Sequence, residues 1–477
     1  MTNESSPKRT PWELLCLAVV VVWGATERWT LIGHGPTSDE ISLLKWRGWE
    51  WIFRDTVNRW HPPLYRMSFT SWLEPAEALS SARHVSLLAG LLTIVMVWAL
   101  ARGLTKSRIL ALAAALGMAA LPHHMLFSVM FRPYAVMLML MCAHLLCLSR
   151  WIQPDPPRWA PWAVGLTATV LPQIHYLALP WLALTAVGTT ALLRPSWRTL
   201  IPYLGAPLVL LPLFEHITGN MGSTTPTSPD WGTLTEHLFG MGLRSKSTLP
   251  GAQEFWPIGI VATAATTARW RWLSAPGRVT VIGTLSMLAA ITWAAGEHRF
   301  TPSTKLLIAP MLWAMIAALP QVIPGRWTMT RSVRWLVAVV LGWVTADALQ
   351  HRLNYHSNNA SPSDQIVNFI RAAPERFPTD HAIRFRVSSH LEIARYMMGR
   401  GVFRATELDD GCPTNRCMNI DGRLWLVDPG DDYTGASVLV LKRTKTPPQL
   451  PPHCTHAEQE KDLPRFAICS AKPEPSE

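Results

Sequence analysis

The stretch TSDEISLLKWRGWEWIFRDTVNRWHPPLY, residues 37–65, follows directly on the first long apolar segment of the chain. It joins two adjacent acids, Asp39 and Glu40, to a segment rich in tryptophan and basic residues and then to a His-Pro-Pro-Leu-Tyr run. Ser-Asp-Glu before an apolar run is a normal helix start, so a solvated turn with a helix cap is the simplest interpretation of the acids. A catalytic interpretation depends on the side of a membrane on which the stretch lies.

The composition predicts a membrane protein. Hydrophobic residues make up 49% of the 477 residues and charged residues only 16%, whereas about a quarter of the residues in a soluble protein are charged. Apolar segments of about 17 to 25 residues, the length that crosses a bilayer, recur from Trp12 to Leu349 and then stop. We therefore expect a transmembrane domain over residues 1–349 and a soluble domain over residues 350–477.

The apolar segments predict an all-α polytopic membrane domain with about eleven spans. Short length or proline in three of them leaves the count open by one or two, because proline kinks a transmembrane helix without ending it. The expected spans are 12–32, 83–101, 109–127, 131–149, 160–173, 175–193, 200–217, 255–269, 279–295, 304–323 and 333–349.

The basic residues predict the orientation, because cytoplasmic turns are enriched in lysine and arginine. This rule places the N-terminus in the cytoplasm and the soluble domain outside it, and we expect a bacterial inner membrane. The first outer loop is an exception, since it holds five basic residues. The segments expected to be cytoplasmic carry Lys8 and Arg9; Arg102, Lys106 and Arg108; Arg150 and Arg158; Arg194 and Arg198; Arg269, Arg271 and Arg278; and Arg326, Arg331 and Arg334.

The basic first loop itself predicts a helix that lies in the headgroup plane. Residues 41–57 are amphipathic, and their basic face would attract phosphate. Pro62 and Pro63 then set the first turn of another helix, where a missing N–H group costs nothing. The aromatic and basic residues of this segment are Trp46, Trp49, Trp51 and Phe53, interleaved with Lys45, Arg47 and Arg54.

The tail, residues 350–477, is predicted to be a small extracytoplasmic α/β domain. SPSDQIVNFIRAAPERF, residues 361–377, is typical of a capped amphipathic helix, and RLWLVDP (423–429) and SVLVLKR (437–443) are typical of strands. We find no catalytic motif in the tail, which favours a docking or lid domain.

The cysteines divide between the two domains. Cys16, Cys142 and Cys147 lie in apolar segments and are expected to behave as small hydrophobic residues. The other four lie in the tail, where an oxidising compartment favours disulfides. Pairing Cys412 with Cys417 and Cys454 with Cys469 is the simplest of three connectivities, and a zinc site is the alternative.

Several motifs resemble one family. The acidic pair, HPPLY at 61–65 and FSVMFRPYAVMLML at 127–140 are together similar to the GT-C glycosyltransferases. Within these, the likeness is to the group of protein mannosyltransferases, lipid A aminoarabinose transferases and RgtA/B/C/D-like proteins. LPQIHYLALPWLAL (171–184) and EHRFTPSTKLLIAPML (297–312) resemble two further elements of that group, although Phe300 stands where tyrosine is usual. The resemblance covers about residues 12–349.

The resemblance implies a glycosyltransferase. It would move a sugar, with inversion, from a polyprenyl-phosphate donor in the bilayer to an acceptor hydroxyl on a glycolipid, glycan or protein; nothing indicates a nucleic-acid partner. Direct displacement needs a carboxylate that removes the acceptor proton and cations that stabilise the leaving phosphate. Asp39 is the candidate base, and Glu40 would hold the acceptor or orient a basic residue.

The resemblance also suggests residues for the donor phosphate. Arg132 and Arg299 are expected on the same face as Asp39, where a guanidinium could contact the phosphate in a bidentate manner. Lys305 and Tyr134 complete this predicted set. Each arginine could instead be an anchor whose charge reaches the headgroups.

The remaining candidates would line the cavity: His61, Tyr65, His175 and Tyr176. The alternatives are a helix start shaped by two prolines for the first pair, and polar packing between helices for the second. No metal ligand or cofactor is assigned, although Asp39, His61 and His175 have the donor atoms of a divalent-metal site. His123 and His124 in PHHM show no spacing that indicates a ligand pair.

Two other functions compete with glycosyl transfer. A transporter or flippase of lipid-linked glycans would also have many spans, but it would place ionisable residues at mid-membrane and show internal repeats. We find no repeat, and the ionisable residues cluster on one outer face. An inactive relative that serves as an assembly partner is the second alternative.

Overall fold

The computed structural model describes most of the N-terminal two thirds of the chain and the strands of the tail. It divides into two compact units, which we describe separately: a helical unit (1–32, 48–71 and 80–355) and a second unit (33–47, 72–79 and 356–477). The described residues are 11–32, 36–44, 63–193, 197–205, 252–295, 306–322, 342, 382–385, 417–420, 423–427, 437–442, 457–459 and 466–470.

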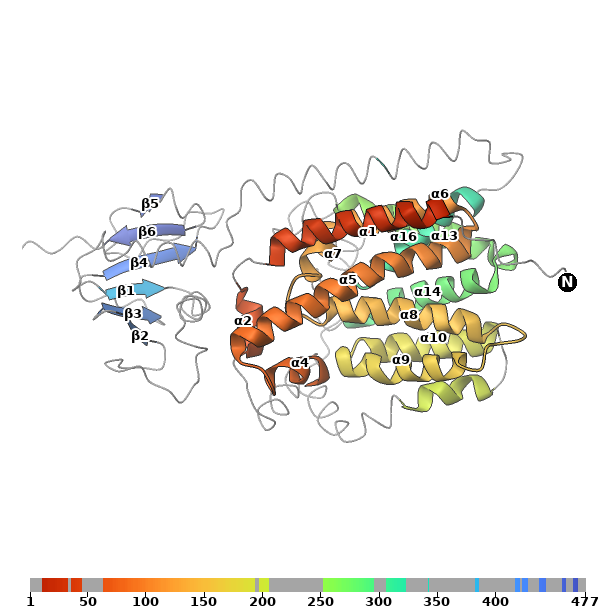
Figure 1. Ribbon diagram of the computed structural model, residues 1–477, viewed down its shortest axis with the longest axis horizontal. Helices are drawn as coiled ribbons and strands as arrows, with labels where there is room; N and C mark the ends of the chain where they lie inside the picture. Colours follow the sequence, from red (N-terminus) through yellow and green to blue (C-terminus); the bar gives the residue numbers. More distant parts are fainter. Residues whose placement is uncertain are drawn as a thin grey trace, which may run out of the picture. The chain divides into compact units, whose positions relative to one another are not determined.

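Three helices form one side of the helical unit (Figure 1). They are α1 (Pro11–Ile32), α5 (Pro75–Thr105) and α6 (Arg108–Ala120). The chain reverses between α5 and α6 in two residues, because Lys106 adopts φ 53° and the backbone N–H of Ser107 donates to Oγ1 of Thr105 over 3.1 Å. α1 and α5 run in opposite directions, since Arg83 near the start of α5 donates to the carbonyl of Ile32.

The other helices complete the bundle. α8 packs on α9, α13 on α16, α10 on α14, and α16 on α6. Glycines allow close approach: an added Cβ at Gly117 of α6 would lie 2.5 Å from the Trp313 ring of α16. Their bounds are α4 (Pro63–Thr70), α7 (Pro122–Phe127), α8 (Tyr134–Trp151), α9 (Ala160–Ile174), α10 (Ala178–Leu192), η1 (Trp197–Leu204), α13 (Ala252–Ala268), η2 (Trp270–Trp272), α14 (Ala275–Ala295) and α16 (Ala309–Val322).

Some buried polar side chains inside the bundle are paired across helices. His144 of α8 lies 2.9 Å from Oγ1 of Thr167 on α9 and 3.1 Å from the hydroxyl of Tyr203 on η1. Trp181 of α10 donates its indole N–H to the carbonyl of Gly283 on α14. An unsatisfied polar group costs several kcal/mol in hydrocarbon, so these bonds allow polar residues to occupy the core.

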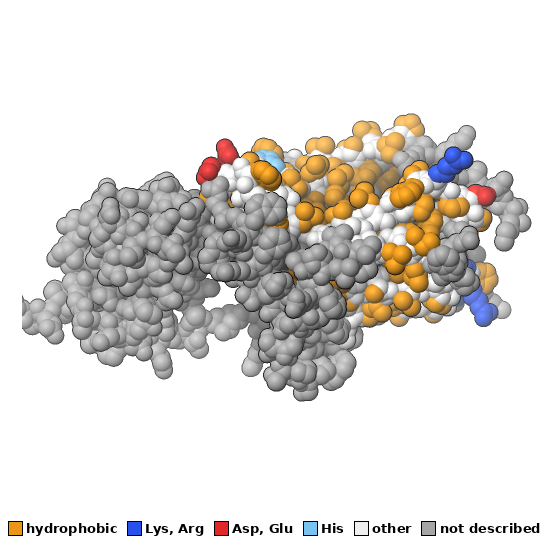
Figure 2. Space-filling view, turned by 90° about the horizontal axis from the view of Figure 1, so that it is seen from below, with side chains coloured by type: hydrophobic (Ala, Val, Ile, Leu, Met, Phe, Trp, Pro, Cys, Tyr) orange, Lys and Arg blue, Asp and Glu red, His pale blue; other side chains and the backbone are white. Residues whose placement is uncertain are grey.

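The helices confirm an integral membrane protein. Among the described residues, four helices are long and apolar enough to cross a bilayer: Pro11–Ile32, Pro75–Thr105, Tyr134–Trp151 and Ala275–Thr292. Large apolar side chains such as Leu15, Val22 and Leu166 are about two thirds exposed, and hydrophobic side chains cover much of the flank in Figure 2. Lysine and arginine side chains lie at one end of the same surface (Figure 2).

Two expected spans differ from the observed elements. The span 109–127 is wrong as a single helix, because Leu121 is extended and Pro122 starts the separate helix α7. Proline has no N–H to continue a helix. The span 200–217 starts as the 3-10 helix η1, and residues 206–217 lie outside the described residues, as does the span 333–349 apart from Gly342.

The second unit contains α2 (Ser38–Leu44) and a six-stranded sheet. The strand order is β2-β3-β1-β4-β6-β5, and β1 is parallel to both β3 and β4, while the other pairs are antiparallel. The strands are β1 (Ala382–Phe385), β2 (Cys417–Ile420), β3 (Arg423–Val427), β4 (Ser437–Lys442), β5 (Ala457–Gln459) and β6 (Phe466–Ser470).

Two of the strands coincide with segments predicted from the sequence, while the α/β fold of the tail stays a prediction. The two strands expected from the sequence are β3 and β4, and the expected helix 361–377 lies outside the described residues. Cys16, Cys142 and Cys147 are free thiols, as expected for small hydrophobic residues. The described part of the chain shows no disulfide, and the pairing of the four tail cysteines stays a prediction because their side chains lie outside that part.

Candidate functional site

Arg132 lies in the connection between α7 and α8. Two prolines shape this connection: Pro122 at the first turn of α7, and Pro133, which directly precedes α8. The backbone N–H of Arg132 donates to the carbonyl of Met130 over 2.7 Å, which makes a tight turn. The side chain of Arg132 is half-buried, and its neighbour Tyr134 is 9% exposed. The turn therefore presents a cation at the end of a bundle helix.

His175 lies between α9 and α10, close to that turn. Pro172 inside α9 precedes the end of the helix, and His175 follows in an extended conformation. The ring of His175 lies 5.6 Å from the ring of Tyr134, measured between centroids. Its Nδ1 accepts the backbone N–H of Leu177 over 3.1 Å. The neutral ring therefore carries its proton on Nε2, which is a hydrogen-bond donor.

The surroundings keep this imidazole neutral. Burial, together with the nearby guanidinium of Arg132, lowers the pKa of His175 to about 4. Burial also raises the pKa of Tyr176 to about 12. At neutral pH the cluster thus combines the charge of Arg132 with an uncharged imidazole donor and a protonated phenol, a set that suits an anion.

Tyr65 reaches the same turn through aromatic packing. Its ring lies 5.4 Å from Phe69 and 5.7 Å from Phe131, the residue that precedes Arg132. Its hydroxyl lies 2.8 Å from Oγ of Ser86 on α5. These contacts show that Tyr65 anchors α4 to α5 and to the Arg132 turn; its place in a substrate cavity stays a prediction.

In the second unit, the acidic pair starts helix α2. Oε2 of Glu40 accepts hydrogen bonds from the backbone N–H and the hydroxyl of Thr37, over 2.9 and 3.2 Å. The backbone N–H of Glu40 donates in return to Oγ1 of Thr37. This reciprocal arrangement is a capping box, and the Glu40 side chain is fully buried. The cap is thus Thr37, one residue before the Ser-Asp-Glu start expected from the sequence.

The structure describes only part of the predicted site. Arg132, Tyr134, His175, Tyr176 and Tyr65 lie in the helical unit, where the contacts above join Arg132, Tyr134 and His175 and bring Tyr65 against Phe131. Asp39 lies in the first turn of α2, although its side chain is outside the described residues, as are His61, Arg299 and Lys305. Within the described part of the chain, no group of three His, Cys, Asp or Glu residues could hold a metal ion.

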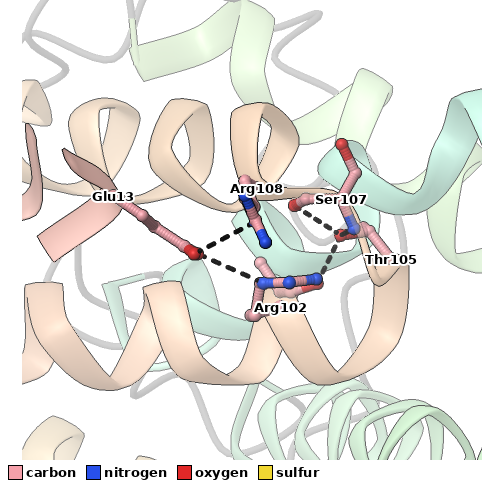
Figure 3. Close-up of polar contacts among 6 residues, drawn as sticks. Glu13, Arg102, Thr105, Ser107 and Arg108 are labelled. Carbon is pink, nitrogen blue, oxygen red and sulfur yellow. Dashed lines mark hydrogen bonds and ion pairs between the residues drawn. The ribbon is translucent and has the colours of Figure 1, made fainter. Parts of the chain in front are cut away.

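Sequence reasoning missed two buried charge clusters on α1. Glu13 forms ion pairs with Arg102 and Arg108 near one end of the helix (Figure 3). Arg28, near the other end, is fully buried and lies 2.7 Å from Nδ1 of His124. The available signal was the presence of ionisable residues inside an apolar span, which indicates a specific partner.

Comparison with known proteins shows which fold the chain shares. The family model of dolichyl-phosphate-mannose-protein mannosyltransferases matches residues 65–218. The crystal structure of ArnT from Cupriavidus metallidurans bound to undecaprenyl phosphate covers 98% of the chain and is itself covered to 99%, with a TM-score of 0.52 and 14% identity. The chain therefore has the fold of the GT-C membrane glycosyltransferases.

The GT-C likeness extends along the whole chain. The apo structure of the same ArnT covers 97% of the chain and is covered to 98%, with a TM-score of 0.50 and 13% identity. No curated protein matches the sequence. The matched family region begins at Tyr65 and includes Arg132, Tyr134, His175 and Tyr176, whereas Asp39, Glu40, Arg299 and Lys305 lie outside it.

Proposed function

We propose that this protein transfers a monosaccharide from a polyprenyl-phosphate-linked donor to an acceptor hydroxyl at the extracytoplasmic membrane face, with inversion. The observation that carries the proposal is the GT-C fold over nearly the whole chain, shared with an ArnT that has been crystallised with undecaprenyl phosphate. The acceptor would be a glycolipid, a glycan or a protein.

The proposed reaction is one displacement at the anomeric carbon. The acceptor oxygen forms a bond to that carbon while the bond to the phosphate oxygen breaks, and the phosphate leaves with the electron pair. Asp39 would take the acceptor proton, and the products would be the glycosylated acceptor and the polyprenyl phosphate. Such a step needs one base and a site that stabilises the leaving phosphate.

Arg132 and His175 support the proposed phosphate site. The guanidinium can give two parallel N–H bonds to phosphate oxygens, and a neutral imidazole can add a third from Nε2. A site of this kind binds the dianionic product more tightly than the donor diester, which favours departure of the phosphate. Arg299 and Lys305 would supply further charge, Tyr134 would support the set by packing against His175, and Tyr176 and His61 would line the sugar site.

The capping box separates the roles of the two acids. The carboxylate of Glu40 is occupied by the N–H and hydroxyl of Thr37, so we assign it to holding the start of α2. Asp39 is the adjacent residue, and a carboxylate in the first turn is favoured by the helix dipole. We therefore propose Asp39 as the base and Glu40 as the residue that fixes the turn beneath it.

The same proposal includes the wider architecture. A GT-C domain of about eleven spans over residues 1–349 would carry the chemistry, with residues 41–57 as an interfacial helix. The tail, 350–477, would be a small extracytoplasmic α/β docking or lid domain. The chain would sit in a bacterial inner membrane with its N-terminus in the cytoplasm, and a divalent metal held by Asp39 and the two histidines is the alternative to a base alone.

The decisive experiment supplies membranes containing the protein with radiolabelled polyprenyl-phosphate sugars. Asp39→Asn should reduce transfer by about 100-fold or more, the usual range for a lost general base. Glu40→Gln is the matched control and should keep most of the activity while it weakens α2. Unchanged transfer by Asp39→Asn would refute the base, and no transfer by the native chain with any donor would favour a transporter or an inactive relative.

A further inference from the structure

The segment that carries Arg132 begins at a break between two helices. α6 ends at Ala120, Leu121 is extended, and Pro122 opens the six-residue helix α7. We call residues 121–133 the elbow segment; it runs from the end of α6 to Pro133, which directly precedes α8. Any residue that holds the elbow segment also sets the place of Arg132.

Arg28 of α1 binds the beginning of the elbow. Its Nη2 donates to the carbonyl of Ala119 over 3.2 Å and lies 2.7 Å from Nδ1 of His124, while its Nη1 donates to the carbonyl of Gly24 over 2.9 Å. The side chain of Arg28 is fully buried. A guanidinium only donates, so Nδ1 of His124 accepts in this contact. The same nitrogen lies 3.0 Å from the carbonyl of Met118, to which it cannot donate while it accepts from Arg28.

Helix physics explains why a buried cation is stable there. The last four carbonyls of a helix have no partner within the helix, and the negative end of the helix dipole favours a cation. Arg28 satisfies one of these carbonyls, that of Ala119, and at the same time grips the first turn of α7 through His124. It therefore fixes the angle at which the chain leaves α6.

A second contact fixes the middle of the elbow. The hydroxyl of Ser128 donates to the carbonyl of His124, and Ser128 is buried against α5. The fit is tight, because a Cβ added at Gly90 would lie 2.3 Å from Oγ and 2.6 Å from Cβ of Ser128. Gly90 thus provides a notch for Ser128 that a larger residue would fill.

The end of the elbow segment contacts the residues of the proposed phosphate site. The N–H of Val129 donates to the carbonyl of Leu126, and the N–H of Arg132 donates to that of Met130. Phe127 of α7 packs against Tyr134, with ring centroids 5.0 Å apart, and Tyr134 packs against His175. A shift of the elbow would move Arg132 relative to His175.

We propose that Arg28 is a positioning residue for the donor-phosphate site: by clamping the end of α6 to α7, it holds Arg132 in the place where it binds phosphate. This inference rests on the proposed function only in assigning phosphate to Arg132. It predicts that Arg28 acts through Arg132 and makes no contact with substrate itself.

The test measures undecaprenyl phosphate binding to the purified full chain in nanodiscs. Arg28→Gln should raise the Kd about tenfold, which corresponds to about 1.4 kcal/mol. Arg102→Gln is the matched control, because Arg102 is also a largely buried arginine but binds Glu13 at the other end of α1. That control should lower thermal stability and leave the Kd unchanged.

A double-mutant cycle separates positioning from general loosening. If Arg28 acts through Arg132, Arg28→Gln should add little to the effect of Arg132→Gln, because residues that act in one unit are not additive. Independent, additive effects would overturn the inference, as would an unchanged Kd in Arg28→Gln. An unchanged Kd in Arg132→Gln would also overturn it.

A second pair of variants tests the inference without changing Arg28, in case Arg28→Gln does not fold. Gly90→Ala should displace Ser128 and raise the Kd. Adding Ser128→Gly should restore binding in part, because it empties the notch but also removes the hydroxyl that binds the carbonyl of His124. If Ser128→Gly restores no binding, the inference that the elbow segment positions Arg132 is contradicted. The proposed function fails separately, if the native chain binds undecaprenyl phosphate but transfers no sugar.

Discussion

The two ends of helix α1 bind arginines in contrasting ways. At the end that we call the Glu13 end, the carboxylate of Glu13 lies 3.2 Å from Nε of Arg102 and 3.5 Å from Nε of Arg108. At the other end, Arg28 is bound to backbone carbonyls and to an imidazole. The first arrangement compensates charge with charge, and the second compensates it with dipoles.

The difference has a physical consequence. Glu13 ties the N-terminal part of α1 to the end of α5 and the start of α6, so the Glu13 end is a lock between three helices (Figure 3). The Arg28 contacts add no anion, so they leave the positive potential of the Arg132 turn in place. A site for a phosphate needs this potential, and a structural lock does not. The comparison predicts that changes at one end alter stability and changes at the other alter function.

The largest effect is expected from Glu13→Gln. This change leaves two guanidinium groups side by side without their shared carboxylate, which should cost about 3 kcal/mol of stability. The measurement is thermal unfolding in detergent, followed by tryptophan fluorescence. Donor KM should stay as in the native chain; a raised KM would show that the lock also shapes the phosphate site.

Arg132→Gln should have the opposite effect: a large loss of activity with little loss of stability. Loss of one charged donor to the leaving phosphate should lower kcat/KM about 100-fold, or about 2.7 kcal/mol, as for other groups that stabilise developing charge. The half-buried position of Arg132 should leave the unfolding temperature nearly unchanged. A large stability loss with normal transfer would place Arg132 among the structural residues instead.

The free energy of unfolding should depend on pH through His175, which lies near Arg132. The pKa of His175 is lowered to about 4 by burial and by Arg132, so the unfolded state binds a proton more readily than the folded state. Stability is then fully present above about pH 6.5, and roughly 3 kcal/mol is lost as the pH falls toward 4.

His175→Gln tests this dependence, because it removes the titrating group. The difference in unfolding free energy between the native chain and the variant should vary with pH only between about 6.5 and 4. Arg132→Gln should raise the pKa of His175 and narrow that window. An equal pH slope in the native chain and in His175→Gln would contradict the assignment.

The smallest effect is expected at two glycines of α5. Gly90→Ala places a methyl group against Ser128 and should cost about 1 to 2 kcal/mol through overpacking. Gly103→Ala, near the Glu13 end, meets Pro276 at 3.2 Å and should be close to neutral. Equal unfolding temperatures for the two variants would show that the Gly90 notch relaxes without strain.

Local sequence signals predicted the helices well and the breaks poorly. The spans 12–32, 131–149 and 279–295 correspond to α1, α8 and α14, because apolar length alone indicates a span. The segment 109–127 was predicted as one helix, since its apolar run continues past Pro122. Proline can be tolerated within a span or can end it. The free carbonyl of Ala119 at this break is bound by Arg28, which lies on another helix.

The candidate site shows the same division. HPPLY and RPYA made Tyr65, Arg132 and Tyr134 candidates from their neighbours in sequence, and the pattern Thr37-x-x-Glu40 already contains the capping box. The contact between His175 and Tyr134 joins residues that lie far apart in the sequence, at the end of α9 and the start of α8. No local sequence pattern encodes such a contact.

By itself, the sequence determined that this is a membrane protein with a polar tail, and it identified motifs similar to those of GT-C enzymes, because apolar length, composition and short motifs are local properties. Tertiary structure alone decided which charges are paired. Glu13 meets Arg102 and Arg108, and Arg28 meets the end of α6, only because helix packing brings distant positions together. Inside a bundle, the free energy of a charge depends on those neighbours, and they set the separate roles of the two ends.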